Sequence, residues 1–87
     1  MAKREVTHTG KDEDGDITKL CYPGEWWSPR MKVDAISDIE LNLYTYYVKV
    51  GVKEVQIHVV NDPERGKYLR TNPDETEKNN LDELPDC

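Results

Sequence analysis

The sequence predicts an α+β fold in which one helix packs on one face of an antiparallel β-sheet, made of two hairpins and a short edge strand. Three observations carry this prediction: strand-forming residues on both sides of an Asp-Gly step, an amphipathic stretch over residues 29–42, and alternating apolar residues around Gly51-Val52. With 87 residues the chain can bury one modest core, so we expect residues 1–87 to form a single domain.

The first predicted hairpin joins residues 5–9 to residues 17–22, and both segments are rich in β-branched side chains. The polar segment between them contains Asp14-Gly15, a pair typical of a two-residue turn. With the turn at that step, the residue numbers of two facing residues add up to 29, so His8 lies opposite Cys21. The register stays open, because a slip of one residue exchanges the two faces and neither face is clearly apolar.

A helix is predicted over about residues 29–42. Ser28 is a favourable N-cap residue, and Pro29 suits the first helical position. The apolar residues recur at helical spacing and define the expected buried face: Met31, Ala35, Ile36, Ile39 and Leu43. The charged residues, Asp38 among them, are expected mostly elsewhere on the helix.

The second predicted hairpin spans residues 44–60 and turns at Gly51-Val52, where glycine takes the first position of a type II′ turn. Paired positions then sum to 103. On one face the pairs are apolar: Tyr44 with Val59, Tyr46 with Ile57, and Val48 with Val55. On the other face they are polar: Thr45 with His58, Tyr47 with Gln56, and Lys49 with Glu54. One face therefore belongs to the core and the other to the surface.

The rest of the chain is predicted to hold a short edge strand over residues 67–71 and a polar, acidic tail from about residue 72. Within the tail, Leu81 and Leu84 have the spacing of one helical turn, and we expect them to close one end of the core. Cys87 is expected to be a free thiol at a mobile terminus.

The charge distribution argues against some functions and locations. The net charge is −6, and residues 61–87 contribute −4 of it, with eight acids against four bases. Affinity for duplex nucleic acid comes mainly from Lys and Arg at phosphates, so we do not expect such binding. No apolar run is long enough to cross a bilayer, no signal peptide is recognisable, and two cysteines are too few for a secreted disulfide scaffold. We expect a cytoplasmic monomer.

The acidic turn at residues 12–16 resembles a calcium-binding loop in its spaced carboxylates and in Gly15. In that alignment, however, the first and last ligand positions are Gly10 and Cys21, and the flanks are strands instead of helices. We interpret the segment as a solvated hairpin turn that binds cations weakly at most.

Motifs for metal binding and catalysis are absent from the sequence. His8, His58 and the two cysteines lack the close spacing of zinc ligands, so we expect no metal and no cofactor. The chain also has no Gly-x-Ser-x-Gly motif and no phosphate-binding glycine loop. We expect no enzymatic activity.

Surface recognition is the remaining class of function. Trp26 and Trp27 are adjacent, so in an extended segment only one can point inward and the other is exposed, unless both lie flat over the start of the helix. Tyr47, His58 and Arg70 extend this candidate surface. The leading prediction is a non-enzymatic module that binds another protein or peptide, centred on the tryptophans, Tyr47 and Arg70.

The alternative prediction is a module that binds a small ligand or single-stranded nucleic acid. Arg70 together with Asn79 and Asn80 can recognise a carboxylate, a phosphate or a peptide backbone, and aromatic side chains can stack on bases. Asn79 and Asn80 can equally serve the fold, by capping a turn near the end of the chain.

The end of the chain carries a specific pattern of short motifs: Tyr68-Leu69-Arg70-Thr71, Asp74, Asn79-Asn80-Leu81 and Leu84-Pro85. With these motifs, the chain resembles a family of small bacterial proteins catalogued only as a domain of unknown function. The likeness extends back to residues 6–20 and includes Trp27-Ser28-Pro29, Ile36, Ile39 and Tyr46-Tyr47. It implies a stand-alone module and supplies no reaction, ligand or catalytic residue. The acidic turn at residues 12–16 departs from the family.

Overall fold

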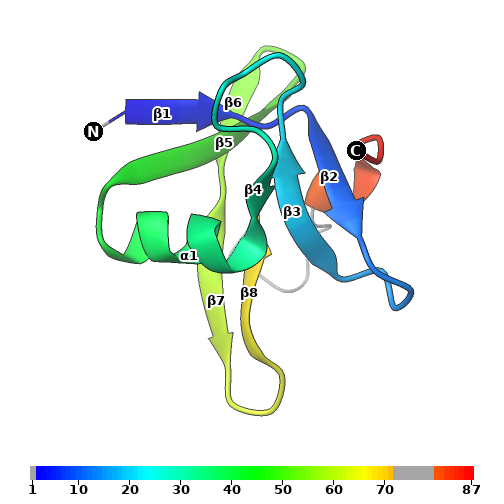
Figure 1. The fold of residues 1–87 in the computed structure, drawn as a ribbon, viewed down its shortest axis with the longest axis vertical. Coiled ribbons are helices and arrows are strands. Elements are labelled where there is room, and N and C mark those ends of the chain that lie inside the picture. The colour runs from blue at the N-terminus through cyan, green and yellow to red at the C-terminus, as the bar shows by residue number, and fades with distance from the viewer. Residues whose placement is uncertain (1, 72–79) are drawn as a thin grey trace.

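A computed structural model describes residues 2–71 and 80–87 of the chain. The elements, in chain order, are β1 (Ala2–Glu5), β2 (His8–Lys11), β3 (Ile17–Cys21), β4 (Arg30–Met31), α1 (Lys32–Glu40), β5 (Tyr44–Val50), β6 (Lys53–Gln56), β7 (His58–Asp62), β8 (Gly66–Arg70) and the 3-10 turn η1 (Asn80–Glu83). One helix lies against mostly antiparallel strands (Figure 1), which confirms the predicted α+β fold.

The strands form three small sheets. Their orders are β1-β5-β6, β2-β3-β4 and β7-β8. β1 pairs with β5 in parallel, over Ala2–Glu5 and Tyr44–Tyr47, and the other pairings between the described strands are antiparallel. Residues 2–4 were not expected to form a strand, because no sequence-adjacent partner marks them as one.

The first hairpin has the predicted register at its open end. His8 lies opposite Cys21 and Thr9 opposite Leu20. A bulge between Gly10 and Lys11 then shifts the pairing, and the loop closes through a hydrogen bond from the Gly15 N–H to the Asp12 carbonyl, 3.0 Å. Gly15 has φ 83°, a conformation that glycine adopts without steric cost. The loop is therefore longer than the predicted two-residue turn.

The helix begins at Lys32, three residues later than the expected start, and ends at Glu40. Ser28 does not cap it: its Oγ accepts a hydrogen bond from the Tyr22 N–H, 2.9 Å, and so closes the loop between β3 and β4. Arg30 and Met31 form β4, which continues the sheet of the first hairpin. The prediction of a helix from residue 29 was wrong because sheet pairing with β3 takes the backbone that the helix would need.

The buried face of α1 is narrower than predicted. Ala35 and Ile36 are buried and Ile39 packs against the core, as expected. Met31 and Leu43 were wrongly assigned to this face, since they are 50% and 54% exposed. Both lie outside the observed helix, so the helical spacing does not hold at these two positions.

The second hairpin is confirmed over its inner half. The register runs from Val50 opposite Lys53 to Tyr47 opposite Gln56, and the Ile57 N–H donates to the Tyr46 carbonyl, 2.8 Å. Beyond Ile57 the chain leaves β5. The predicted pairs of Tyr44 with Val59 and Thr45 with His58 were therefore wrong, because His58 and Val59 belong to β7, which pairs with β8 instead.

The strand predicted at residues 67–71 is confirmed as β8, and its partner is β7. The turn between them is closed by the Asp62 carboxylate, whose Oδ1 accepts hydrogen bonds from the N–H groups of Glu64, 2.8 Å, and Arg65, 3.2 Å. The five-pair ladder runs from His58 opposite Arg70 to Asp62 opposite Gly66. This local turn chemistry explains why β7 pairs with β8 and not with β5.

One hydrophobic core joins all three sheets and the helix. Its buried members are Val6, Ile17, Leu20, Trp27, Ala35, Ile36, Tyr46, Val48, Ile57, Leu69 and Leu81. Leu81 is fully buried in η1 and Leu84 packs beside it, as the predicted helical turn requires. Among residues 2–71 and 80–87, no helix is sufficiently long and apolar to traverse a membrane.

The C-terminal residues are part of the fold, which corrects the prediction of a free Cys87. Cys87 forms a disulfide with Cys21. The Thr9 N–H donates to the Pro85 carbonyl, 3.0 Å, and the Cys87 N–H donates to the Thr9 carbonyl, 3.2 Å. Cys21 lies opposite His8, the residue before Thr9. The hydrogen bonds between Thr9 and residues 85 and 87 therefore place Cys87 beside Cys21. The disulfide also removes the cysteine-based support for a cytoplasmic location.

Replacing Cys87 with serine should lower the free energy of unfolding by about 2–4 kcal/mol, because the disulfide closes a long loop, between residues 66 positions apart. Urea unfolding of wild type and variant measures the difference. Dithiothreitol should reduce the stability of wild type to that of the variant and leave the variant unchanged. Two reactive thiols in the unfolded, unreduced wild-type protein would contradict the disulfide.

Candidate functional site

A buried carboxylate on α1 organises the most unusual part of the structure. Asp38 is only 3% exposed, and it lies on the inner face of the helix, three positions after Ala35. The Arg30 guanidinium forms two parallel hydrogen bonds with it: Nε donates to Oδ2 and Nη2 donates to Oδ1, each at 3.0 Å. The Tyr46 hydroxyl donates a hydrogen bond of 2.6 Å to Oδ2. Both carboxylate oxygens are therefore occupied.

Arg4 completes this group, which we call the Asp38 network: Arg4, Arg30, Asp38 and Tyr46. Arg4 is 7% exposed, its Nη1 donates to the Tyr46 hydroxyl at 2.9 Å, and the same nitrogen lies 3.8 Å from Asp38 Oδ2. Burial of an arginine is tolerated when hydrogen bonds and an opposite charge offset its desolvation. No buried side-chain nitrogen or oxygen in residues 2–71 and 80–87 lacks a partner.

Four aromatic rings surround the Arg4 guanidinium. The Cζ atom lies 3.5 Å from the ring centroid of Tyr44, 5.2 Å from Trp26, 5.4 Å from Trp27 and 5.7 Å from Tyr46. These distances are within the range of cation–π attraction, which is stronger for a desolvated cation than for an exposed one. The rings and the Asp38 network therefore hold Arg4 in one position.

The protonation states follow from the surroundings. Burial acts to raise the pKa of Asp38, but the hydrogen bonds from Arg30 and Tyr46, with the charges of Arg30 and Arg4, outweigh it and lower the pKa. Burial and the hydrogen bond to Asp38 raise the pKa of Tyr46 to about 12. At neutral pH Asp38 is therefore ionised and Tyr46 is neutral. The network has no free general base.

The two tryptophans differ sharply in exposure, as their adjacency predicts. Trp27 is 9% exposed and packs edge-on against Tyr46, with ring centroids 5.9 Å apart. Trp26 is 81% exposed although it lies beside the buried Arg4. The alternative, in which both rings lie flat over the helix start, does not hold. Trp27 belongs to the core, so of the pair only Trp26 is available to a partner.

Tyr47, predicted as part of the same surface, faces the other way. It follows Tyr46 on β5, and successive residues of a strand point to opposite faces of the sheet. Its ring lies 5.4 Å from the ammonium group of Lys3, which also pairs with Glu54 at 2.8 Å. The structure thus separates Tyr47 from Trp26 by the thickness of a sheet.

The remaining predicted residues lie on the β7–β8 hairpin and after it. His58 and Arg70 are directly opposite each other across β7 and β8. The Asn80 N–H donates to Thr71 Oγ1 at 2.9 Å, which caps the start of η1, while Asn79 lies outside the described residues. In Figure 1 the loop between β3 and β4, which carries the tryptophans, is at the end of the molecule opposite the β7–β8 turn. The predicted residues therefore do not form one patch.

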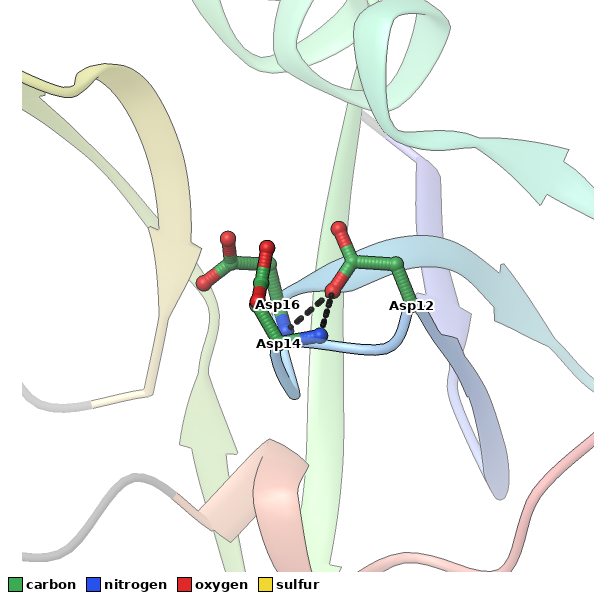
Figure 2. A group of neighbouring side chains, drawn as sticks. All are labelled: Asp12, Asp14 and Asp16. Carbon is green, nitrogen blue, oxygen red and sulfur yellow. Dashed lines mark hydrogen bonds between the residues drawn. The ribbon is translucent and has the colours of Figure 1, made fainter.

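The acidic turn brings three carboxylates together. Figure 2 shows Asp12, Asp14 and Asp16 side by side, with candidate ligand oxygens within 4.8 Å of one another. Asp12 Oδ1 accepts hydrogen bonds from the N–H groups of Asp14, 2.9 Å, and Asp16, 3.0 Å. All three side chains are exposed, and β2 and β3 flank the turn. The geometry supports the interpretation as a solvated hairpin turn in which Asp12 orders the loop.

The disulfide removes both cysteines from the set of candidate metal ligands. His8 and Cys21 form the predicted cross-strand pair, but the disulfide leaves Cys21 without a thiolate that a metal ion can bind. His8 Nδ1 is 2.8 Å from Thr7 Oγ1, within hydrogen-bonding distance.

Sequence reasoning missed the three charged residues of the Asp38 network. Asp38 did carry a signal, because it lies one turn after Ala35 and next to Ile39, inside the apolar stripe of the helix. An acid at such a position requires a cationic partner. Arg4 carried no signal, since it contacts Tyr46 only through a parallel pairing 42 positions away in the sequence.

The fold and this network define a small α+β domain organised by a buried arginine–aspartate pair. A family model described as "Protein of unknown function (DUF3892)" matches residues 5–85. The chain belongs to this family, which confirms the resemblance noted in its sequence. No curated protein matches the chain, and no solved structure matches it.

Replacing Asp38 with asparagine should lower the free energy of unfolding by about 3–5 kcal/mol, because two arginines lose their buried counter-charge. Asp34→Asn is the matched control, since Asp34 is an exposed acid on the same helix, and its effect should stay within about 0.5 kcal/mol. Urea unfolding monitored by circular dichroism measures both variants. A loss below about 1 kcal/mol for Asp38→Asn would show that the network does not stabilise the fold.

The lowered pKa of Asp38 predicts a dependence of stability on pH. Folding favours the ionised carboxylate, so its contribution is present above the unfolded-state pKa of about 4 and is lost as the pH falls through the folded-state value. Urea unfolding between pH 7 and the acid limit should give a steeper acid loss for wild type than for Asp38→Asn. Parallel profiles for the two proteins would contradict the assignment.

Proposed function

We propose that this protein is a non-enzymatic module that binds another protein or a peptide through Trp26. The observation that carries the proposal is the 81% exposure of a tryptophan whose ring lies 5.2 Å from a buried guanidinium. Large aromatic side chains are normally buried for most of their surface, and tryptophan and arginine are enriched among the residues that dominate binding energy at interfaces.

The support beneath Trp26 favours recognition. Arg4 is held by the Tyr46 hydroxyl and by the charge of Asp38, and the Tyr44 ring covers it at 3.5 Å. A ring that rests on such a base loses less freedom on binding than one on a flexible loop. Pre-organisation of this kind increases affinity because less conformational entropy remains to be lost.

The Asp38 network supports a binding role over a catalytic one. Arg4 and Asp38 are the buried charged side chains within residues 2–71 and 80–87. Asp38 accepts three hydrogen bonds, and the phenol of Tyr46 stays neutral to a pH of about 12. An acid or base that serves catalysis needs a lone pair or proton directed at a substrate, which this closed network does not offer.

The alternative of single-stranded nucleic acid binding has weaker support. Such proteins align several exposed aromatic rings along a basic groove. Here Trp26 lies in the loop between β3 and β4, Tyr47 is on β5, and Arg70 is on β8 in a different sheet. A partner that presents an apolar side chain to one exposed indole fits the arrangement better.

Replacing Trp26 with alanine should abolish retention of the native partner from cell extract and weaken its binding about 30-fold or more once it is purified. The matched control is Val52→Ala, which truncates another fully exposed apolar side chain, at the tip of the β5–β6 hairpin. Pull-down with quantitative mass spectrometry, followed by titration of the purified partner, gives both measurements.

The result depends on a difference between the two variants. Partners retained by wild type and Val52→Ala but lost with Trp26→Ala support the proposal, provided that circular dichroism shows Trp26→Ala folded. If all three proteins retain the same partners with equal affinity, Trp26 is not the binding residue and the proposal fails.

A further inference from the structure

A hollow of about 250 Å³ lies on the side of the molecule formed by β8, the acidic turn, the start of α1 and η1. Six charged residues line it: Lys32, Arg65, Lys67, Arg70, Asp16 and Asp82. None of them belongs to the Asp38 network or to the surface around Trp26. The hollow is therefore a second site, and the inference drawn from it does not depend on the proposed protein-binding function.

The charge of this hollow is opposite to that of the chain. Among residues 2–71 and 80–87, four Lys or Arg residues and two acids line it, so this described lining carries a formal charge of +2 while the chain carries −6. In a protein with this excess of acids, four cations on one concave surface create a local field that attracts anions.

The lining of the hollow is mostly polar, and the buried residues Leu69 and Ile17 lie at it. Lys32 is also the first residue of α1, and Met31 before it caps no N–H group with its side chain, so the positive end of the helix dipole adds to the field at the rim.

The existing ion pairs of Arg65 and Lys67 are exposed and replaceable. Arg65 lies 3.7 Å from Asp16, and both side chains are more than half exposed. Lys67 binds Glu40 at 2.7 Å with both partners more than 40% exposed, and Lys32 has no ion-pair partner among the described residues. Exposed pairs of this kind contribute little to stability, so a multiply charged anion can compete for their cations.

We propose that this hollow binds a small phosphate-bearing anion. The Arg65 guanidinium can donate two parallel hydrogen bonds to phosphate oxygens, and the ammonium groups of Lys32 and Lys67 add point charges. The volume equals that of about eight waters at their share in the liquid, and it lies below the range of about 300–1,000 Å³ typical of pockets for drug-sized ligands. The ligand is therefore inorganic phosphate or a small phosphate monoester.

The test is a titration of the ¹⁵N-labelled protein at pH 7.5 with inorganic phosphate and, separately, with methyl phosphate, while sodium chloride keeps the ionic strength constant. Binding at the hollow should give saturable amide shifts at Gly15, Lys32 and Tyr68, which line it. Tighter binding of methyl phosphate identifies a monoester as the ligand class, and tighter binding of inorganic phosphate identifies the free ion.

Two variants with the same loss of charge show whether the hollow itself binds. Lys32→Gln/Arg65→Gln should weaken binding about tenfold or more, whereas Lys49→Gln/Lys53→Gln, on the β5–β6 hairpin, should leave it unchanged. Asp82→Asn removes a repulsive carboxylate and should strengthen binding a few-fold.

Three results would overturn the proposal. The first is the absence of saturable shifts with either anion at about 20 mM, which is far above the millimolar range of weak specific binding. The second is equal weakening by the two double variants, which would mean an adventitious ion only. The third is saturation confined to amides away from the hollow.

Discussion

The carboxylate of Asp38 is the point at which the separate parts of this fold meet. It extends from α1 and receives Arg30 from β4, in the sheet of the first hairpin, and Tyr46 from β5, in the sheet of the second. Arg4, from β1, joins through the same tyrosine. Because a helix and two sheets share one ionised group, their relative positions depend on its charge and hydrogen bonds as well as on the hydrophobic core.

Local chemistry made about half of the fold predictable. The inner half of the second hairpin follows from its turn, the first hairpin has the predicted register at its open end, and Leu81 docks as its spacing with Leu84 suggests. The errors share one cause: another partner competes for the same backbone or side chain. Sheet pairing moves the helix start past residue 29, β8 pairs with the residues expected opposite the start of β5, and Cys87 forms a disulfide with Cys21 across 66 positions.

The candidate sites were less predictable than the fold, and for the same reason. Trp26 was identified because adjacent tryptophans cannot both point inward. The arginine beneath it and the cations around the second site come from elements that only the tertiary structure brings together. Arg70 stays a prediction as a binding residue; it lines the hollow together with Lys32 and Arg65, whereas the sequence suggested Asn79 and the tryptophans as its neighbours.

The parallel pairing of β1 with β5 also constrains the order in which the structure can form. The hairpins β2–β3, β5–β6 and β7–β8 close short loops, whereas β1 can dock only on a β5 that already exists, across more than 40 residues. Arg4 is part of β1, so we expect the base under Trp26 to be assembled late in folding. A partially folded chain that already has its hairpins would lack the surface that Trp26 offers, and recognition would report on completion of the fold.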